Sequence, residues 1–239
     1  MAHGLLGIER TQNLGLRALL RKLNLEGKQL GTGQLIFVLA PRINALGRMG
    51  SALEAVTMLT TEDSDKAMAI ANILEEQNQR RRQVDERMYR EAIEMVEQEV
   101  DLDQDKAIVL ASDDWHPGVI GIVASRIAER VHLPTVLISI EGDSGKGSAR
   151  SIPGFDLFGA LSRCRSHLTS FGGHKYAAGL SVEKTQLPAF RKALLEAAVE
   201  LIDQDDLIPK LEIDDEITLD QIDKKLIDIL KRFGPFGPQ

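Results

Sequence analysis

The feature that most constrains the fold of this sequence is a long stretch without glycine or proline. It follows Thr61–Asp63, a typical helix start, and continues to about Val100. Apolar residues recur in it near helical spacing, among them Ala67, Ala71 and Leu74. At 1.5 Å per residue, this helix would be roughly 50 Å long, more than a compact domain usually needs. We therefore predict one long helix that connects two lobes.

The middle of this helix, Gln77–Gln83, carries only polar side chains. We expect it to be exposed and to span the space between the lobes. The chain before the helix is interrupted by glycines and is typical of a small helical region. Helices are predicted there over 14–25, 34–40 and 51–59.

After Asp101 the pattern changes to that of an α/β domain. Ala107–Ala111 and Thr135–Glu141 are short apolar runs typical of buried parallel strands, and a helix over Gly118–Val131 would be their right-handed crossover. The remaining elements predicted in this domain are a strand over 145–151, a helix over 156–167, a Gly-Gly loop, a strand near 180–183 and a helix over 187–203. Beyond the domain, 210–217 is predicted as a strand and 219–233 as a helix.

The predicted fold class is therefore α/β, with a central mixed sheet in the second half of the chain. We expect a helical region at 1–62, the connecting helix at 63–100, the α/β domain at 101–205 and the start of a further domain at 206–239. The final Gly234–Gln239 is rich in turn-forming residues. We expect it to be a linker inside a longer protein.

Composition excludes several classes of protein. The chain is 43% apolar and 27% charged, which is typical of globular proteins rather than disordered ones. It has no apolar run of the roughly 18 residues that span a bilayer and no secretory signal pattern at Met1, so we expect a cytoplasmic protein without membrane association. The single cysteine, Cys164, forms no internal disulfide or thiolate zinc cluster, and we expect it to be buried.

The net charge of −7 argues weakly against nucleic acid, because lysine and arginine supply the affinity for phosphates. Much of the acidic excess, however, lies between Asp203 and Asp228. Basic residues elsewhere cluster with glycines, so the sequence allows local anion binding.

The first such cluster holds Arg42, Asn44 and Arg48 among residues that let the backbone turn tightly. Guanidinium groups bind phosphate in bidentate geometry. A helix–loop–helix corner with solvated arginines explains the pattern equally well.

The second cluster is Gly142–Ser151. If residues 146–150 are extended, Lys146, Ser148 and Arg150 share one face, and only glycine, alanine and serine lie on the other. Two cations and a hydroxyl on an approachable backbone favour phosphate binding over a merely polar edge hairpin. The spacing of a Walker loop is absent, which argues against nucleotide triphosphate hydrolysis.

The third cluster is Gly172, Gly173 and His174. Paired glycines let a backbone N–H approach a ligand closely, and His174 could donate to a phosphate oxygen or carry a proton as an auxiliary group. Without a neighbouring carboxylate pair, His174 is not predicted to be a catalyst, and no other residue is.

A fourth segment, Asp113–Arg126, leads from a strand into a helix. Gly118, Gly121 and Ser125 are small enough for this helix to pack tightly on a neighbour. Its acids and His116 could suggest a metal, but an aspartate that caps the helix explains them more simply. No metal site is predicted in the chain.

Together, these motifs resemble the RecJ family of single-strand-specific exonucleases, within the DHH phosphoesterase superfamily. The Gly-Gly-His motif alone is less specific, because it also marks the DHH-associated domain of oligonucleotide phosphodiesterases and part of some alanyl-tRNA synthetases. The resemblance covers most of the chain and rests on Pro41–Ala45 with Gly47-Arg48, Trp115–Arg126, Lys146–Ser151 with Pro153–Phe155, Gly172–His174 with Ala177–Gly179, and Pro235–Pro238.

The resemblance implies an exonuclease that degrades single-stranded DNA from its 5′ end with Mn²⁺ or Mg²⁺, in recombination and repair, with a helicase or single-strand-binding protein as a further partner. In that family an N-terminal DHH domain holds the metals, and this sequence has no Asp-His-His triplet. We therefore expect a part without the metal site that is inactive alone. Its domain at 101–205 would be the DHH-associated domain, and 206–239 would begin a truncated oligonucleotide-binding domain. The residues predicted to bind strand and phosphate are Arg42, Asn44, Arg48, Lys146, Ser148, Arg150, Gly172, Gly173 and His174.

Two alternatives remain at this point. One is a DHH-type phosphodiesterase of short oligoribonucleotides or cyclic dinucleotides. The other is a non-catalytic nucleic-acid-binding or scaffold module, which the negative net charge favours. The long connecting helix and the segment after Lys210 favour the exonuclease.

Overall fold

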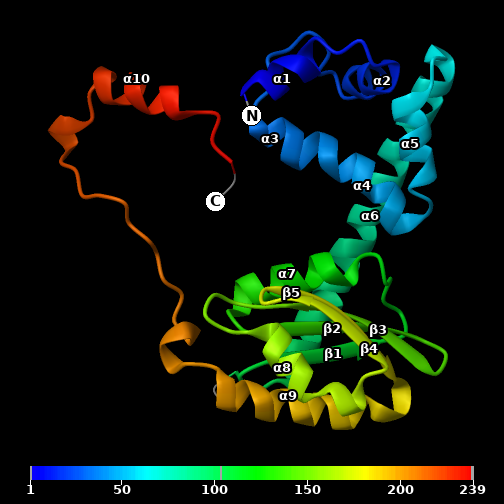
Figure 1. The fold of residues 1–239 in the computed structure, drawn as a ribbon, viewed down its shortest axis with the longest axis vertical. Coiled ribbons are helices and arrows are strands. Elements are labelled where there is room, and N and C mark those ends of the chain that lie inside the picture. The colour runs from blue at the N-terminus through cyan, green and yellow to red at the C-terminus, as the bar shows by residue number, and fades with distance from the viewer. Residues whose placement is uncertain (1, 103, 238–239) are drawn as a thin grey trace. The chain divides into compact units, whose positions relative to one another are not determined.

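The computed structural model describes residues 2–102 and 104–237 (Figure 1). The chain forms two compact units. Unit 1 consists of the residues up to Arg81 together with those from Leu211 onward, and unit 2 consists of Arg82–Lys210. The division falls inside one long helix, so each unit contains part of it.

Unit 1 begins with a helical region, as predicted. Its buried leucines and Met58 form one hydrophobic core, to which the long helix contributes Leu74. Gly15 is required where two of these helices meet, because a Cβ there would overlap the backbone carbonyl of Met58. The helices are α1 (Ala2–Glu9), α2 (Leu14–Lys22), α3 (Thr32–Gln34), α4 (Ala40–Met49), α5 (Leu53–Thr60) and the first part of α6 (Ser64–Glu99).

The segment around Pro41 is helical, whereas the helix predicted over 34–40 ended before it. A π-helical turn over Leu35–Leu39 joins α3 to α4, and the amide of Ala40 donates to the carbonyl of Leu35. The following residue, Pro41, has no amide proton. The wider turn directly before the proline lets the helix continue through it.

The predicted long helix is confirmed by α6, whose 36 residues extend about 54 Å. Its middle, however, is not exposed on all sides as predicted. Asn78 is only 2% exposed, and its Oδ1 accepts a hydrogen bond of 2.9 Å from Arg81. A polar side chain can be buried where a hydrogen bond compensates its lost hydration, so polarity alone did not establish exposure.

Unit 2 contains a five-stranded mixed sheet with the strand order β1-β2-β3-β5-β4. The predicted parallel pair is confirmed, since β1 and β2 are parallel, and the other neighbours are antiparallel. The strands are β1 (Ile108–Ser112), β2 (Thr135–Glu141), β3 (Ser144–Arg150), β4 (Ser170–His174) and β5 (Ala177–Glu183).

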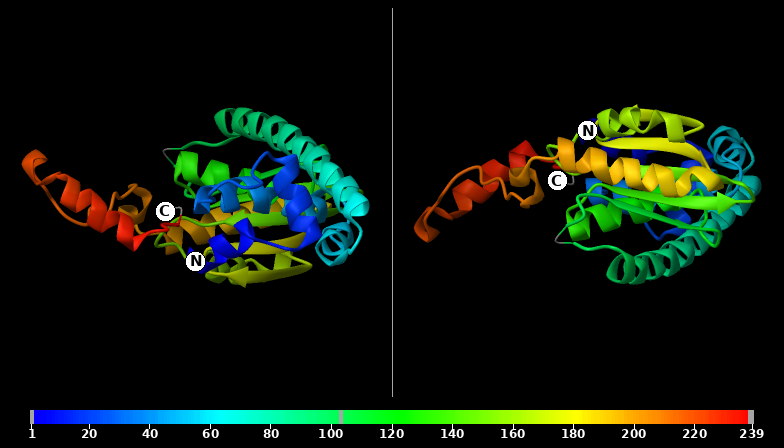
Figure 2. Two further views of the ribbon diagram at one scale, coloured as in Figure 1. Left: turned by 90° about the horizontal axis from the view of Figure 1, so that it is seen from above. Right: turned by 90° about the horizontal axis from the view of Figure 1, so that it is seen from below.

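Helices cover the two faces of this sheet (Figures 1 and 2). On one face, α7 (Ile120–Val131) packs on β2 and β3. On the other, α8 (Leu157–Arg163) and α9 (Leu187–Leu201) enclose a core with the apolar side chains of the strands. Cys164 is buried in this core as expected, and burial raises the pKa of its thiol to about 11. Short 3-10 turns lie at 165–167, 184–186 and 204–207.

The second part of α6 belongs to unit 2 and lies beside α7. Asp85 accepts a hydrogen bond of 3.1 Å from Arg126, whose guanidinium lies 3.7 Å from the ring centroid of Tyr89. Glu91 accepts a hydrogen bond of 3.2 Å from the buried Trp115 indole. These contacts fix α7 and the turn before it.

Two local predictions in the second half of the chain were wrong. The Gly-Gly segment is not a loop but part of strand β4, which forms a hairpin with β5. The strand predicted over 210–217 is absent: these residues lie in irregular chain, and Leu211 is 86% exposed. Their apolar alternation has no partner strand within the described residues, and a strand needs one for its backbone hydrogen bonds.

The rest of the C-terminal segment contains a 3-10 turn (Leu219–Gln221) and α10 (Lys224–Phe233), where one continuous helix was predicted. Asp223 separates them, because its carboxylate caps α10 by accepting from the amide of Leu226 at 2.7 Å. The predicted terminal linker includes Pro238 and Gln239, which lie outside the described residues.

Candidate nucleic-acid interface

The predicted alternation of β3 is confirmed. Gly145, Gly147 and Ala149 are buried, whereas Lys146 is exposed and Ser148 and Arg150 are half-buried on the opposite face. The buried glycines leave room for the core, because a Cβ on Gly147 would overlap the side chain of Leu180. The sequence thus presents its polar residues on the sheet face that also carries α7.

Arg150 is held in one orientation by its neighbours. Its Nε donates a hydrogen bond of 3.0 Å to Oγ of Ser125 on α7. Its Nη1 donates to Oγ of Ser148 at 2.9 Å and to the carbonyl of Ala149 at 2.8 Å. A guanidinium held in this way loses little conformational entropy when it binds an anion.

The approach of α7 to this arginine depends on Gly121. A Cβ at this position would lie 2.8 Å from Oγ of Ser148 and 2.9 Å from Nη2 of Arg150. One helical turn later, Ser125 donates its own proton to the carbonyl of Gly121 at 3.1 Å, which leaves its oxygen free to accept from Arg150. Gly121 and Ser125 therefore act together to position the pair on β3.

Beside Arg150, the same sheet face continues over β5 and β4, where its residues are very small. We call this part of the face, centred on Gly179 and Gly172, the floor. In the strand register, Ser148 pairs with Gly179, and Gly179 pairs with Gly172. Both glycines are exposed, and no atom lies within 4 Å of a Cβ built on Gly172. A ligand could therefore lie directly against the backbone here.

His174 lies at the end of this floor. Arg150 pairs with Ala177, and Ala177 pairs with His174, so two strand spacings, about 10 Å, separate the Cα atoms of Arg150 and His174. Nδ1 of the imidazole accepts the amide of Tyr176 at 3.3 Å. The proton of the neutral ring then resides on Nε2, which makes Nε2 a hydrogen-bond donor.

Gly173, the residue before this histidine, must be glycine. Its φ of 153° is unfavourable for other residues, and a Cβ would overlap Ala177 and Ala178. The two glycines of the motif thus have different roles. Gly173 allows the strand to pair closely, and Gly172 leaves the floor open.

The predicted residues of the first cluster all lie on helix α4 in unit 1. Arg42 is mostly buried, forms an ion pair with Glu75 of α6 and donates to the carbonyl of Val38 at 2.7 Å. At about 100° per residue, Asn44 and Arg48 lie on the other side of the helix, where both are exposed. Phosphate binding by Arg42 would require it to exchange its carboxylate partner.

Partial burial opposes ionisation of Glu75, but hydrogen bonds from Arg42 and Gln79 outweigh it and hold the pKa of Glu75 below its usual value of 4.5. This carboxylate is therefore charged at neutral pH. The ion pair fastens α4 to α6 within unit 1.

The turn before α7 is not capped by an aspartate, so that prediction was wrong. The N-cap residue is Val119, which has no side-chain cap, and Nδ1 of His116 accepts the amide of Gly118 at 3.1 Å. This hydrogen bond lies within the turn and does not reach an amide of α7 (Ile120–Val131). In the described part of the chain, no group of three or more His, Cys, Asp or Glu side chains could hold a metal ion.

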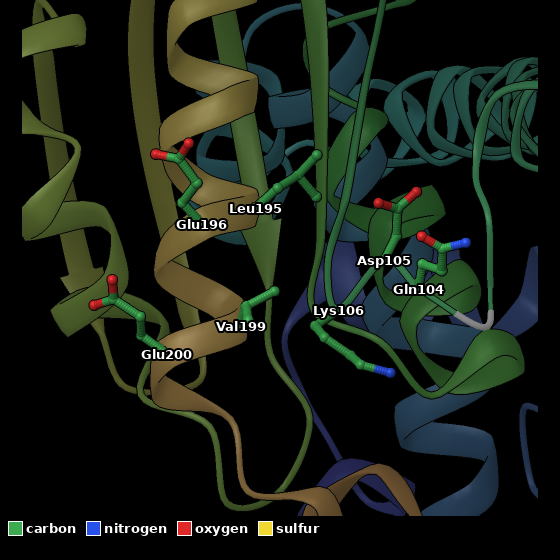
Figure 3. A pocket seen from close by; sticks show the side chains of 7 residues that line it. All are labelled: Gln104, Asp105, Lys106, Leu195, Glu196, Val199 and Glu200. Atoms are coloured by element: carbon green, nitrogen blue, oxygen red, sulfur yellow. The ribbon is translucent and has the colours of Figure 1, made fainter.

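A pocket in unit 2 lies away from this face, between the segment 104–106 and helix α9 (Figure 3). Its volume is about 330 Å³, and Leu195 and Val199 contribute apolar side chains. Three carboxylates also line it, from Asp105, Glu196 and Glu200, against the single cation of Lys106. This acidic lining disfavours phosphate, so the pocket is not a candidate for nucleic acid.

Sequence reasoning did not assign Ser125, Gly121 or Gly179 to the candidate interface. The small residues of α7 indicated tight packing but not which neighbour they contact. Gly179 was part of a motif, and its position opposite Ser148 follows only from the strand register.

No helix among the described residues is long and apolar enough to cross a membrane.

The DHHA1 domain model matches residues 104–200. The chain is 41% identical to the single-stranded-DNA-specific exonuclease RecJ of Bacillus subtilis and 32% identical to RecJ of Escherichia coli, over 98% and 93% of its length. It spans only 30% and 40% of those two relatives.

Solved structures agree in fold. The chain resembles RecJ of Thermus thermophilus in complex with Mg²⁺ with a TM-score of 0.85 and 32% identity, over 98% of this chain and 36% of that one. It resembles an exonuclease RecJ bound to manganese with a TM-score of 0.72 and 36% identity, over 84% of this chain and 49% of that one. The chain therefore belongs to the RecJ family and contains its DHHA1 domain.

Proposed function

We propose that this chain is the strand-binding part of an exonuclease that degrades single-stranded DNA from a 5′ end in recombination and repair. The face formed by β3, β5 and β4 binds the sugar–phosphate backbone, and Arg150 binds a phosphate, with preference for one at the 5′ terminus. The observation that carries this proposal is the fixed guanidinium of Arg150 beside the open glycine floor.

The chemistry of this face fits a phosphate. Arg150 provides a positive charge in a fixed orientation, which attracts phosphate oxygens, and Ser148 adds a hydroxyl beside it. His174 provides an Nε2–H donor at the far end of the floor, and Lys146 adds a second positive charge along β3. Because these groups contact a backbone and not base edges, binding should be tolerant of sequence.

Among the described residues, no group of three or more His, Cys, Asp or Glu side chains is placed to hold a metal ion, so the proposal assigns the metal to another part of the whole protein. In the proposed whole protein, a further domain would hold Mg²⁺ or Mn²⁺, which would activate water there. The proposed role of this part is to bind and orient the strand, and we expect it to be inactive alone.

The experiment compares a 5′-phosphorylated single-stranded oligonucleotide with its 5′-hydroxyl counterpart by fluorescence anisotropy. Arg150→Ala should weaken binding of the phosphorylated strand about 10- to 100-fold, because a hydrogen-bonded charge contributes roughly 1.5–3 kcal/mol. The matched control is Arg163→Ala on α8, whose guanidinium is paired with Glu200 at 2.6 Å on the opposite side of the sheet. Equal affinity of the Arg150→Ala chain and the unchanged chain would contradict the proposal.

A length series separates this function from that of a phosphodiesterase for very short RNA or cyclic dinucleotides. The extended floor over β5 and β4 favours a strand that continues past its first phosphate. Affinity should therefore rise from a dinucleotide to longer single strands. A preference for dinucleotides would support the alternative enzyme.

A further inference from the structure

An exposed aromatic side chain lies at the turn between β4 and β5. The turn consists of Lys175 and Tyr176, and Tyr176 is 54% exposed. The other tyrosine of the chain, Tyr89, is covered by the guanidinium of Arg126. Single exposed aromatic residues are common in proteins, so the exposure of Tyr176 alone is not evidence of a site, and its surroundings decide.

The position of Tyr176 is fixed relative to the proposed phosphate site. Its carbonyl accepts a hydrogen bond of 2.9 Å from the amide of Ser151, the residue after Arg150. The carbonyl of Lys175 accepts from the amide of Leu157 at 3.1 Å. Backbone hydrogen bonds thus hold both residues of the turn in place. Tyr176 directly precedes Ala177, which is the register partner of Arg150.

The ring of Tyr176 lies beside the donor at the end of the floor. Its centroid is 6.4 Å from that of the His174 imidazole, and the two planes meet at 70°. Nζ of Lys175 lies 5.7 Å from the centroid of the Tyr176 ring. An aromatic face next to two groups suited to phosphate is the arrangement with which proteins bind single-stranded nucleic acid, where bases stack on rings and the backbone follows the cations.

We infer that Tyr176 stacks on a nucleobase of the bound strand, close to the phosphate at Arg150. This inference rests on the proposed function and adds to it a contact with a base. Because every base has a π face, the contact favours single-stranded over paired nucleic acid without reading sequence. Phe158, which is also partly exposed, is engaged differently, since its ring packs on Phe171 at a centroid distance of 5.6 Å.

The test is a set of 5′-phosphorylated oligonucleotides in which one of the first nucleotides lacks its base. The chain is compared with its Tyr176→Ala, Tyr176→Leu and Tyr176→Phe variants by fluorescence anisotropy. Loss of the ring should weaken binding of the intact strand at least about fivefold in the Ala and Leu variants. The Phe variant should keep the affinity of the unchanged chain, because it retains the aromatic face.

The abasic strands decide whether the lost contact is stacking. One abasic position should weaken binding to the unchanged chain and have no effect on the Tyr176→Ala chain. Equal losses in both chains at every abasic position would overturn the inference, as would full affinity of the Tyr176→Ala chain for the intact strand.

Arg150→Ala separates this inference from the proposed function. If Arg150→Ala weakens binding and Tyr176→Ala does not, the strand-binding function stands and the stacking is wrong. If the unchanged chain binds no oligonucleotide at low salt, the proposed function fails and the inference with it.

Discussion

Nε of Arg150 on strand β3 donates a hydrogen bond of 3.0 Å to Oγ of Ser125 on helix α7. The two residues are separated by 25 positions in the sequence. This contact places a guanidinium in one orientation at the border of an open sheet face, and the proposed binding of phosphate depends on it.

Ser125→Ala should weaken oligonucleotide binding about 2- to 10-fold. The change removes one hydrogen bond to Arg150, which corresponds to roughly 0.5–1.5 kcal/mol. The matched control is Ser162→Ala on α8, because Oγ of Ser162 also donates to the carbonyl four residues earlier, that of Phe158, at 2.7 Å. If the Ser125→Ala and Ser162→Ala chains bind the oligonucleotide with equal affinity, Ser125 does not position Arg150.

Gly121→Ala should destabilise unit 2 and weaken binding. In an open helix this change would stabilise by roughly 0.5–1 kcal/mol, because alanine has the better helix propensity. Here the new Cβ would lie 2.8 Å from Oγ of Ser148, so we expect a net loss of about 1–3 kcal/mol from overpacking. Gly33→Ala, at a helical position with no atom within 4 Å of the new Cβ, is the control and should not destabilise. Thermal unfolding measures the stability of both variants. A Gly121→Ala chain that is more stable than the unchanged chain would refute the close approach of α7 to β3.

Gly179→Val should reduce binding without reducing stability. A Cβ at Gly179 approaches only the carbonyl oxygen of Gly147, at 4.0 Å, and valine is favoured in strands. The side chain would cover the floor and should lower oligonucleotide affinity at least about tenfold. On the buried face of the same sheet, Gly147→Val should instead prevent normal packing, because even a Cβ would overlap Leu180. Unchanged affinity in a folded Gly179→Val chain would show that the strand does not contact the floor.

Glu75→Gln should destabilise unit 1 in a pH-dependent way. The pKa of Glu75 is lower in the folded state than in the unfolded chain, so its ionisation stabilises the fold at pH values above about 4.5. This contribution is lost as the pH falls through the lower pKa of the folded state. At neutral pH we expect a loss of about 1–3 kcal/mol from this mostly buried pair with Arg42. Urea unfolding at a series of pH values measures the difference, which should shrink on acidification. A difference that does not change with pH would contradict this account of the ion pair.

The parts of the fold that could be predicted are those with strong local patterns. The long helix follows from the absence of glycine and proline over 64–99, and the parallel strands follow from two continuous apolar runs. The two faces of β3 follow from simple alternation. In these segments, local preference and tertiary packing favour the same structure.

Other features depend on contacts between distant segments. Glycine has a low strand preference, so Gly172 and Gly173 were predicted to form a loop, but pairing with β5 makes them a strand. Spacing placed Gly121 and Ser125 on one helix face without showing that Arg150 lies against it. For the candidate interface, the sequence therefore predicted the charged groups, and only the structure revealed the residues that orient them.

The most direct test of the central claim is the salt dependence of single-strand binding by this chain. If Arg150 binds a backbone phosphate, the logarithm of the association constant should fall linearly with the logarithm of salt concentration, and Arg150→Ala should reduce that slope by about 0.7. Arg163→Ala, which removes the same charge from the opposite side of the sheet, should leave the slope unchanged. Identical slopes for the unchanged and Arg150→Ala chains would contradict the proposal that this arginine binds the strand.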